Sequence, residues 1–306
     1  MKKQRTTHGS PKPAWIDKVA RHLHQALRDQ RVYTAGELAQ FLDLHRIELS
    51  IPGSLTLRRF TEALEGAGVL HQVRIEPANR RGTGESYKPF SRYVWPDATA
   101  RQVAISLRSN SFFSHATAAH LHGLLTAPPD AIYLNKEQSE KSRPTAQLTQ
   151  PAIDMAFSNE ARASKYIYVY QRQRLVLISG KHTANYGIED RKDETGFSIR
   201  LTDLERTLVD IAVRPIYAGG VEAILEVYRK ARNDLSVAKI ASTLAALDYV
   251  YPYHQAIGFY LSRAGIPESK LAPLRSLEIK FNFYLCNRLS QPVLNEQWRV
   301  YVPGNL

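Results

Sequence analysis

The sequence predicts an α+β protein in which an N-terminal winged helix-turn-helix is followed by a mixed α/β domain. Helical spacing of apolar residues dominates the first seventy positions, and two strand-like runs with a basic segment between them come next. Helix and strand patterns then interleave through the rest of the chain. With 306 residues, 43% of them hydrophobic, the chain is long enough for two or three domains.

The composition excludes several classes of protein. No apolar run approaches the ~20 residues that cross a bilayer, so we expect no membrane partner. The basic N-terminal residues have no apolar stretch behind them, so we expect no secretory signal, and we expect residues 1–13 to be a disordered arm. The single cysteine, Cys286, excludes a disulfide framework and a Cys-rich zinc site, and it favours a cytoplasmic location.

The net charge of +12 is densest towards the N-terminus. Residues 1–97 contain 16 Lys and Arg against 10 Asp and Glu, whereas residues 98–306 contain 25 against 19. Each part therefore carries +6, but the first is less than half as long. Excess positive charge supplies sequence-independent affinity for nucleic acid. A solvated basic surface would have the same composition, so charge alone does not decide between the two interpretations.

Two amphipathic helices are expected at the start of the first domain. Residues 14–31 carry apolar side chains at helical spacing. Thr34 and Glu37 then form a Thr-x-x-Glu capping box, which begins a second helix. The connection over residues 45–53 is longer than the turn of the simplest helix-turn-helix. Winged variants of the motif tolerate such a connection.

A third helix, within residues 54–68, has the features of a recognition helix. Its apolar residues form one stripe, and Thr56, Arg58 and Arg59 lie off that stripe near its beginning. A recognition helix presents its N-terminal side chains to base edges in the major groove, and Arg is the commonest reader of guanine. These three residues are therefore predicted to face DNA, the alternative being an ordinary solvated helix face.

The segment after this helix is typical of a wing. Strand-like alternation over 69–75 and a short strand at 93–95 enclose a basic, glycine-bearing segment. Such a segment contacts phosphates or the minor groove, which positions a domain without specifying sequence. The predicted contacts are Arg80, Arg81, Lys88 and Arg92. Together these patterns predict a winged-helix DNA-binding domain over residues 14–97.

The remaining residues, 98–306, are predicted to form an α/β domain, which could comprise two lobes. Its polar, charged segment over 135–150 is expected to be a loop. Helices are expected at 101–108, 114–123, 203–214, 221–232, 237–247 and 256–264, and strands at 131–134, 166–171, 175–179, 280–285 and 297–302.

The strongest local signals of this domain lie in one short segment. Thr202 and Glu205 are spaced as a capping box, which predicts a helix beginning at position 203. Arg206 and Asp210 are four residues apart, close enough to pair on the helix surface. Pro215 then ends the helix. All of these features stabilise a helix, and none indicates catalysis.

Two constellations could carry chemistry, and both are weak. His115, His120 and His122 are close in sequence, but no Asp, Glu or Cys completes a metal site, so structural or capping roles are favoured. Asp130 with Glu278-x-Lys280 resembles a restriction-type nuclease pattern at far too long a spacing. The familiar phosphate-binding, dinucleotide-binding and nucleophile motifs are missing. We therefore expect neither enzymatic activity nor a cofactor, with a magnesium-dependent nuclease as the hypothesis to exclude.

The segments SHATAAHLHGLL (114–125) and GFSIRLTDLERTLVDIAVRPIYAGG (196–220) resemble the AbiEi family. These proteins are antitoxins of bacterial type IV toxin–antitoxin systems, which act in abortive infection, a phage defence. A third segment, IGFYLSRAGI, resembles a family helix but has Ile257 and Phe259 where Arg and Tyr are usual. The residues that match the motifs are Ser114, Thr117, His122, Gly123, Arg206, Asp210, Pro215, Gly219 and Gly220.

The resemblance implies a function for each predicted domain. The winged helix would bind inverted repeats in double-stranded DNA of its own promoter and act as a transcriptional repressor. The C-terminal domain would counter a nucleotidyltransferase toxin encoded nearby, generally without a stable complex. The motif residues are interpreted first as structural. The alternative for Arg206, Asp210 and Arg214 is direct participation in antitoxicity. The alternative is a winged-helix transcriptional regulator whose C-terminal domain senses a ligand or mediates dimerisation, with no toxin partner.

Overall fold

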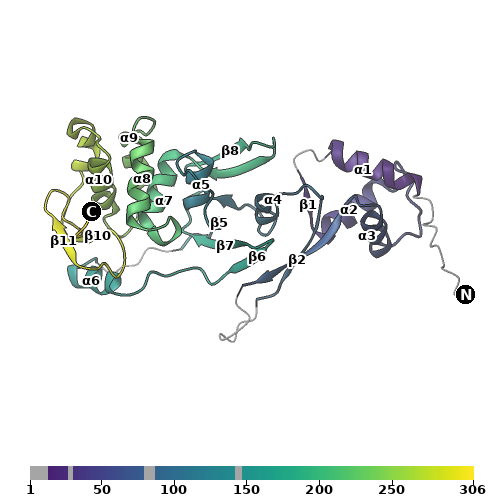
Figure 1. Cartoon of the computed structure of the whole chain (residues 1–306), viewed down its shortest axis with the longest axis horizontal. Helices are drawn as coiled ribbons and strands as arrows, with labels where there is room; N and C mark the ends of the chain where they lie inside the picture. Colours follow the sequence, from purple (N-terminus) through teal and green to yellow (C-terminus); the bar gives the residue numbers. More distant parts are fainter. Residues whose placement is uncertain (1–12, 27–29, 79–86, 142–146) are drawn as a thin grey trace, which may run out of the picture. The chain divides into compact units, whose positions relative to one another are not determined.

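The computed structural model describes residues 13–26, 30–78, 87–141 and 147–306, and it is a mixed α/β structure (Figure 1). The chain divides into two compact units. Unit 1 comprises Met1–Glu76 and Glu85–Leu107, and unit 2 comprises Pro77–Gly84 and Arg108–Leu306. Across the described residues, no helix combines the length and the apolar character needed to cross a membrane.

Unit 1 packs helices beside a small antiparallel sheet. The strand order is β1-β3-β2, and Val94 pairs with both Val32 and His71. Its elements are α1 (Ala14–Ala26), β1 (Val32–Tyr33), α2 (Ala35–His45), α3 (Leu57–Gly66), β2 (His71–Pro77), β3 (Phe90–Val94) and α4 (Ala100–Ile105). The apolar stripes of the helices form its core, which includes Trp15, Val19, Leu23, Leu38, Phe41, Phe60 and Leu64.

The predicted helix ends in unit 1 can be compared with the structure. Thr34 and Glu37 form the predicted capping box, with Thr34 Oγ1 accepting from the Glu37 amide at 3.1 Å. The first predicted helix is too long, because α1 ends at Ala26 and residues 30–31 are not helical. The third helix ends at Gly66, and Gly68 has the left-handed backbone, with φ of 68°, that glycine adopts readily.

In unit 2, a mixed sheet lies beside a group of helices. The described strands follow the order β6-β7-β5-β4-β9-β8, with parallel pairs at β7–β5 and β4–β9. The elements up to the end of this sheet are β4 (Phe112–Phe113), α5 (His115–Leu121), β5 (Ala131–Glu137), α6 (Gln150–Ser158), β6 (Ile167–Tyr170), β7 (Gln173–Gly180), β8 (Ile188–Lys192) and β9 (Ser198–Thr202).

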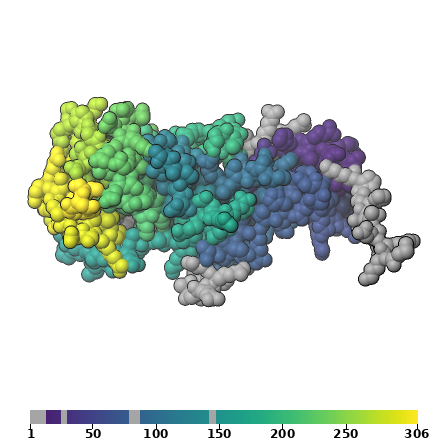
Figure 2. All heavy atoms as spheres, viewed as in Figure 1, coloured from purple at the N-terminus to yellow at the C-terminus, as the bar shows by residue number. Residues whose placement is uncertain are grey.

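The largest core of unit 2 is helical and is closed by the C-terminal strands. In Figure 2 the spheres of this region, green to yellow, pack continuously. Gly258 lies against the buried Trp298 ring, where an added Cβ would come within 2.4 Å of ring carbon. The elements of unit 2 that follow the mixed sheet are α7 (Leu204–Val213), η1 (Pro215–Tyr217), α8 (Val221–Ala231), α9 (Val237–Leu247), α10 (Tyr253–Arg263), η2 (Glu268–Leu271), α11 (Ala272–Arg275), β10 (Phe283–Tyr284), β11 (Pro292–Asn295) and β12 (Val300–Pro303).

Several predicted boundaries in unit 2 were wrong. Residues 135–137 extend β5 rather than beginning a loop, because Asn135 is buried in the middle of the sheet. Helix α6, which begins at position 150 and is capped by Thr149, was not predicted. Strands β8 and β9 were not predicted. Strand β8 has no buried position, whereas burial alternates along β9 from Ser198 to Leu201. In the tail, β12 pairs with β10 in parallel and with β11 antiparallel, so a third strand was also missed.

Candidate nucleic-acid interface and buried polar cluster

The N-terminal turn of α3 presents two arginines to solvent. Arg58 and Arg59 are both exposed, while Phe60 and Leu64 on the opposite side are fully buried. The Arg58 guanidinium donates to Glu62 Oε1 at 2.8 Å, and 88% of the Arg58 side chain remains exposed. The buried stripe therefore fixes the helix and leaves both cations at its surface.

Thr56 has a structural role in the same turn. Its hydroxyl accepts from the Arg59 amide at 3.4 Å, and its backbone is extended, as at a helix N-cap. The side chain is exposed. Thr56 was predicted among the DNA-facing residues, and the structure assigns its hydroxyl to the start of the helix.

The predicted wing contacts separate into three groups. Lys88 is exposed just before β3, and Arg80 and Arg81 lie outside the described residues. The prediction for Arg92 was wrong, because its side chain is buried and bonds within unit 1. Its guanidinium donates to the Ser106 carbonyl at 2.7 Å and to the Ser91 carbonyl at 2.8 Å, and burial lowers its pKa.

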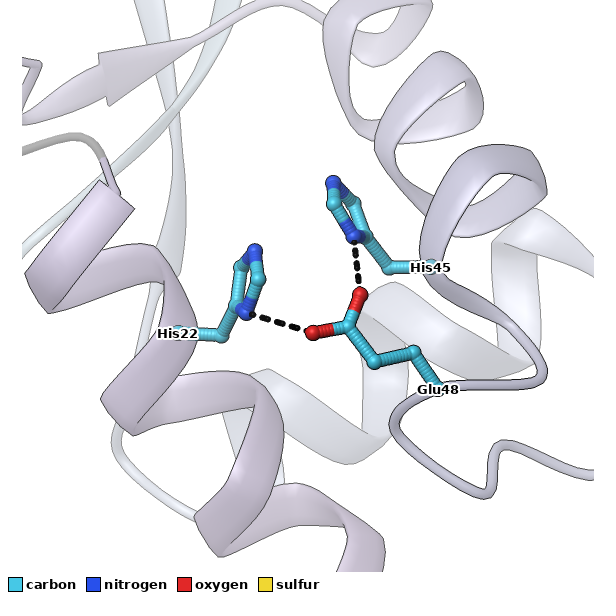
Figure 3. A group of neighbouring side chains, drawn as sticks. All are labelled: His22, His45 and Glu48. Atoms are coloured by element: carbon cyan, nitrogen blue, oxygen red, sulfur yellow. Dashed lines mark hydrogen bonds and ion pairs between the residues drawn. The ribbon is translucent and has the colours of Figure 1, made fainter.

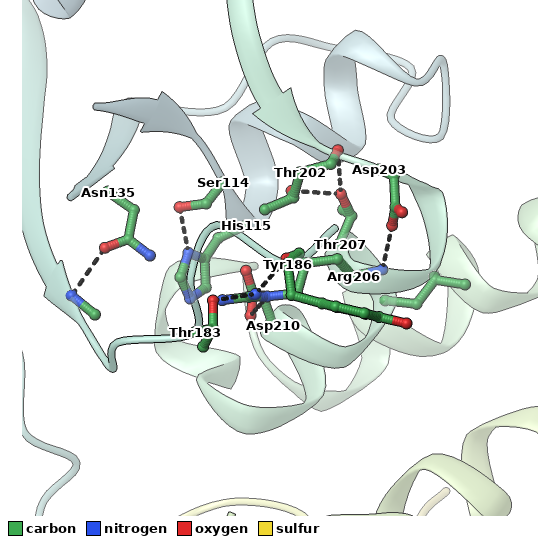
Figure 4. Close-up of polar contacts among 12 residues, drawn as sticks. Ser114, His115, Asn135, Thr183, Tyr186, Thr202, Asp203, Arg206, Thr207 and Asp210 are labelled. Atoms are coloured by element: carbon green, nitrogen blue, oxygen red, sulfur yellow. Dashed lines mark hydrogen bonds and ion pairs between the residues drawn. The ribbon is translucent and has the colours of Figure 1, made fainter. Parts of the chain in front are cut away.

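Three motif residues, Ser114, Arg206 and Asp210, lie in a buried polar cluster around α7 (Figure 4). The predicted capping box was wrong. Asp203, not Thr202, is the N-cap, and its carboxylate accepts from the Arg206 amide at 2.8 Å. The Thr202 hydroxyl instead lies 2.7 Å from that of Thr207. The Glu205 carboxylate accepts from the Ser236 amide and pairs with a lysine on α9.

Arg206 and Asp210 form the predicted ion pair across four residues of α7. The pair is buried, however, and does not lie on the helix surface as predicted. Arg206 Nε donates to Asp210 Oδ1 at 2.9 Å, and the side chains are only 3% and 5% exposed. The guanidinium also donates to the Tyr186 carbonyl at 2.8 Å and to Thr183 Oγ1 at 3.2 Å. Arg206 therefore attaches α7 to the segment before β8.

This attachment depends on residues that sequence analysis did not identify. The Glu137 carboxylate at the end of β5 accepts from the Thr183 amide at 2.8 Å, which holds the segment near Arg206. Gly187 has φ of 69°, and an added Cβ there would lie 2.9 Å from Arg206 Cβ. These contacts join positions far apart in sequence, so no local pattern could have indicated them.

The first motif segment supports the same cluster from α5. Ser114 was predicted to cap α5, but its hydroxyl makes no cap hydrogen bond and lies 2.8 Å from His115 Nδ1. Thr117 Oγ1 accepts from the Tyr133 amide at 2.8 Å, which ties α5 to β5. His122 Nε2 lies 2.8 Å from the Thr202 carbonyl. These polar atoms are therefore occupied by neighbouring parts of unit 2.

The glycines and proline of the motifs shape the chain around the helices. Gly123 follows α5 with φ of 75°, and Pro215 begins the short turn after α7. Gly219 and Gly220 have φ of 82° and 90° before α8 begins. Residues with a Cβ rarely adopt these angles, so the turn requires glycine there.

His115 is the most strongly perturbed histidine of the cluster. Burial lowers its pKa to about 4, an effect that Asp210 opposes and that Arg214 and Arg206 reinforce. It is therefore neutral near pH 7. His115, His120 and His122 do not meet as a set of metal ligands within the described residues. The cluster is bonded largely within unit 2, whereas Asp210 Oδ2 and His120 Nδ1 are buried without a hydrogen-bond partner among the described residues.

The residues that resemble a nuclease pattern, Asp130, Glu278 and Lys280, lie on the surface of unit 2. Glu278 and Lys280 were expected on a strand, but they lie outside the strands of the described chain. They pair with each other at 2.9 Å, and their side chains are 70% and 61% exposed. Asp130 is also exposed. The arrangement is that of a surface ion pair.

Comparisons with known proteins define the fold only. No protein-family model and no curated protein matches the chain. Among solved structures, the chain is similar to the crystal structure of the RV2827C protein from Mycobacterium tuberculosis, with a TM-score of 0.56 and 16% sequence identity. The similarity covers 96% of this chain and 92% of that one. At this identity the likeness shows a shared fold alone.

Proposed function

We propose that the chain is a DNA-binding autorepressor and the antitoxin of a type IV toxin–antitoxin system. In this proposal unit 1 binds the promoter of its own operon as a winged helix. Unit 2 counters a nucleotidyltransferase toxin, and the chain itself is not an enzyme. The observation that carries the DNA-binding part is the pair of exposed arginines on the capped first turn of α3.

The layout of unit 1 supports this assignment. Helix α3 follows α2 and precedes the antiparallel β2–β3 pair, which is the order of a recognition helix and wing. Lys88 is exposed immediately before β3, where it can contact phosphate. Arg92 has no part in this surface, because it is buried.

The antitoxin part rests on the order and spacing of the AbiEi-like motifs. Ser114, Thr117 and Arg206 bond to neighbouring groups inside unit 2. One carboxylate oxygen of Asp210 accepts from Arg206, and the other is buried without a hydrogen-bond partner among the described residues. We infer that they maintain the fold of the antitoxin domain and do not act on the toxin themselves. The function would then depend on the surface that this cluster supports.

A co-expression experiment tests the antitoxin proposal. The gene next to this one should encode a nucleotidyltransferase whose induction stops bacterial growth, and the full chain should restore growth. The control is Arg206→Ala, which leaves the Asp210 carboxylate buried without its partner, so unit 2 should be destabilised and rescue should fail. A harmless neighbouring gene, or no rescue by the intact chain, would favour a plain transcriptional regulator.

A further inference from the structure

Three side chains that can bind metal converge in unit 1 (Figure 3). His22 lies on α1, His45 ends α2, and Glu48 follows in the connection to α3. One ligand atom from each side chain lies within 4.8 Å of the other two. The group thus brings together two separate helices and the segment that precedes α3.

The two imidazoles face the same carboxylate. His45 Nδ1 lies 2.9 Å from Glu48 Oε2, and His22 Nδ1 lies 3.7 Å from Glu48 Oε1. The two rings are themselves close, with centroids 4.3 Å apart. Both Nδ1 atoms therefore point towards a common position next to Glu48, as Figure 3 shows.

A buried aromatic ring fixes the positions of the histidines. Phe41, on α2, is only 8% exposed and belongs to the core of unit 1. Its ring centroid lies 5.6 Å from that of His22 and 4.9 Å from that of His45. The imidazoles therefore pack against the core on one side and remain open to solvent on the other.

The connection that carries Glu48 is anchored as well. Leu49 and Ile51 are buried, with 6% and 5% exposure. The Arg46 guanidinium donates to the carbonyls of Pro52 and Leu55, at 2.7 and 3.2 Å. Arg46 is the cation nearest to Glu48 in sequence, and these bonds hold it to the connection instead of to the Glu48 carboxylate. All three ligands are thus held by packed elements before any ion binds, which reduces the cost of ordering them.

We propose that His22, His45 and Glu48 form a binding site for a first-row transition-metal ion of the Zn²⁺ type. Two imidazoles and a carboxylate suit such ions, whereas Mg²⁺ and Ca²⁺ prefer oxygen ligands alone. The side chains are 22%, 29% and 61% exposed, so an ion can enter from solvent. Three protein ligands leave at least one coordination position for water.

Metal binding adds a property to unit 1 that DNA binding does not require. The ion connects α1 to the end of α2 and to the segment leading into α3. The proposal stands on the geometry of these three side chains and does not depend on the function of α3. A titration without DNA therefore separates its failure from a failure of the DNA-binding proposal.

Calorimetric titration of the full-length chain, without an affinity tag, with ZnCl₂ tests the site. We expect a Zn²⁺ ion to bind the wild-type chain, and Glu48→Gln and His45→Gln to weaken that binding at least about tenfold, a loss seen even for outer-shell partners. His71→Gln is the matched control, because His71 is exposed in the same unit and outside the group. It should bind Zn²⁺ as the wild type does.

Two further measurements keep the test decisive. Glu48→Gln changes an exposed side chain, so its circular dichroism without metal should equal that of the wild type. Co²⁺ should give visible absorption bands of a nitrogen- and oxygen-coordinated ion in the wild type and lose them in His45→Gln. The proposal is overturned if the wild-type chain binds no Zn²⁺, or if both site variants bind it as tightly as His71→Gln does.

Discussion

Helices α3 and α7 contain the same kind of ion pair in opposite environments. In α3, Arg58 pairs with Glu62 four residues later at 2.8 Å, and in α7, Arg206 pairs with Asp210 at 2.9 Å. The first pair is 88% and 54% exposed, whereas the second is 3% and 5% exposed. Both helices begin at a residue whose side chain caps the amide three positions later.

The difference lies in what the pair can do. An exposed pair exchanges freely with water, so Arg58 can leave Glu62 for a phosphate or a base at little cost. A buried pair cannot be broken without leaving a charge unsolvated, so Arg206 is held within the fold. Equal spacing in sequence therefore gives a residue available for binding in one unit and a structural residue in the other.

Removing the buried cation should have the largest effect. In Arg206→Ala the Asp210 carboxylate is left buried without its partner, and we expect a loss of about 3–5 kcal/mol of unfolding free energy. Hydrogen exchange of the α7 amides measures this loss locally. The matched variant Glu62→Ala breaks the exposed pair, and the α3 amides should exchange as in the wild type. Equal effects of the two variants would remove the distinction between the helices.

The buried cluster should also make the stability of unit 2 depend on pH. The pKa of His115 is about 4 in the folded chain, below its value of ~6.5 in an unfolded chain. The unfolded state therefore binds the proton first as the pH falls. Stability that His115 contributes is complete above pH ~6.5 and is lost between pH ~6.5 and ~4, by about 3 kcal/mol in total.

A comparison with His115→Gln isolates this contribution from that of the carboxylates. Urea unfolding at a series of pH values should show that the wild type loses more stability than the variant over this range. The two chains should have parallel pH profiles below pH ~4. Parallel profiles across the whole range would show that burial does not hold His115 neutral.

A smaller effect is expected from adding a side-chain atom at Gly187, next to the Cβ of Arg206. Gly187→Ala places a Cβ 2.9 Å from Arg206 Cβ, at a φ of 69°. We expect a loss of about 1–3 kcal/mol in thermal or urea unfolding, the usual range for an overpacked site. Gly53→Ala is the control in the connection before α3, where no atom lies within 4 Å of the added Cβ. If both variants are neutral, the segment before β8 does not constrain α7.

Local patterns predicted most of the helices, with α6 and α11 missed, and they predicted the polar contacts poorly. The Thr34–Glu37 box and the spacing of Arg206 and Asp210 are decided within one helical turn, and both formed as expected. Whether that turn is buried depends on distant residues, such as Glu137, that the spacing does not reveal. Arg92 shows the same limit, because its bond to Ser106 joins two elements and removes it from the surface.

The most direct test of the central claim is a DNA titration. Binding of the full chain to a labelled fragment of its own promoter should weaken about fivefold or more in Arg59→Ala, because a base-reading arginine contributes about 1–3 kcal/mol. Arg229→Ala removes the same charge from an exposed ion pair on α8 in unit 2, and it should leave the affinity unchanged. If Arg59→Ala binds like the wild type, or if both variants weaken binding equally, the assignment of α3 as the DNA-facing helix is contradicted.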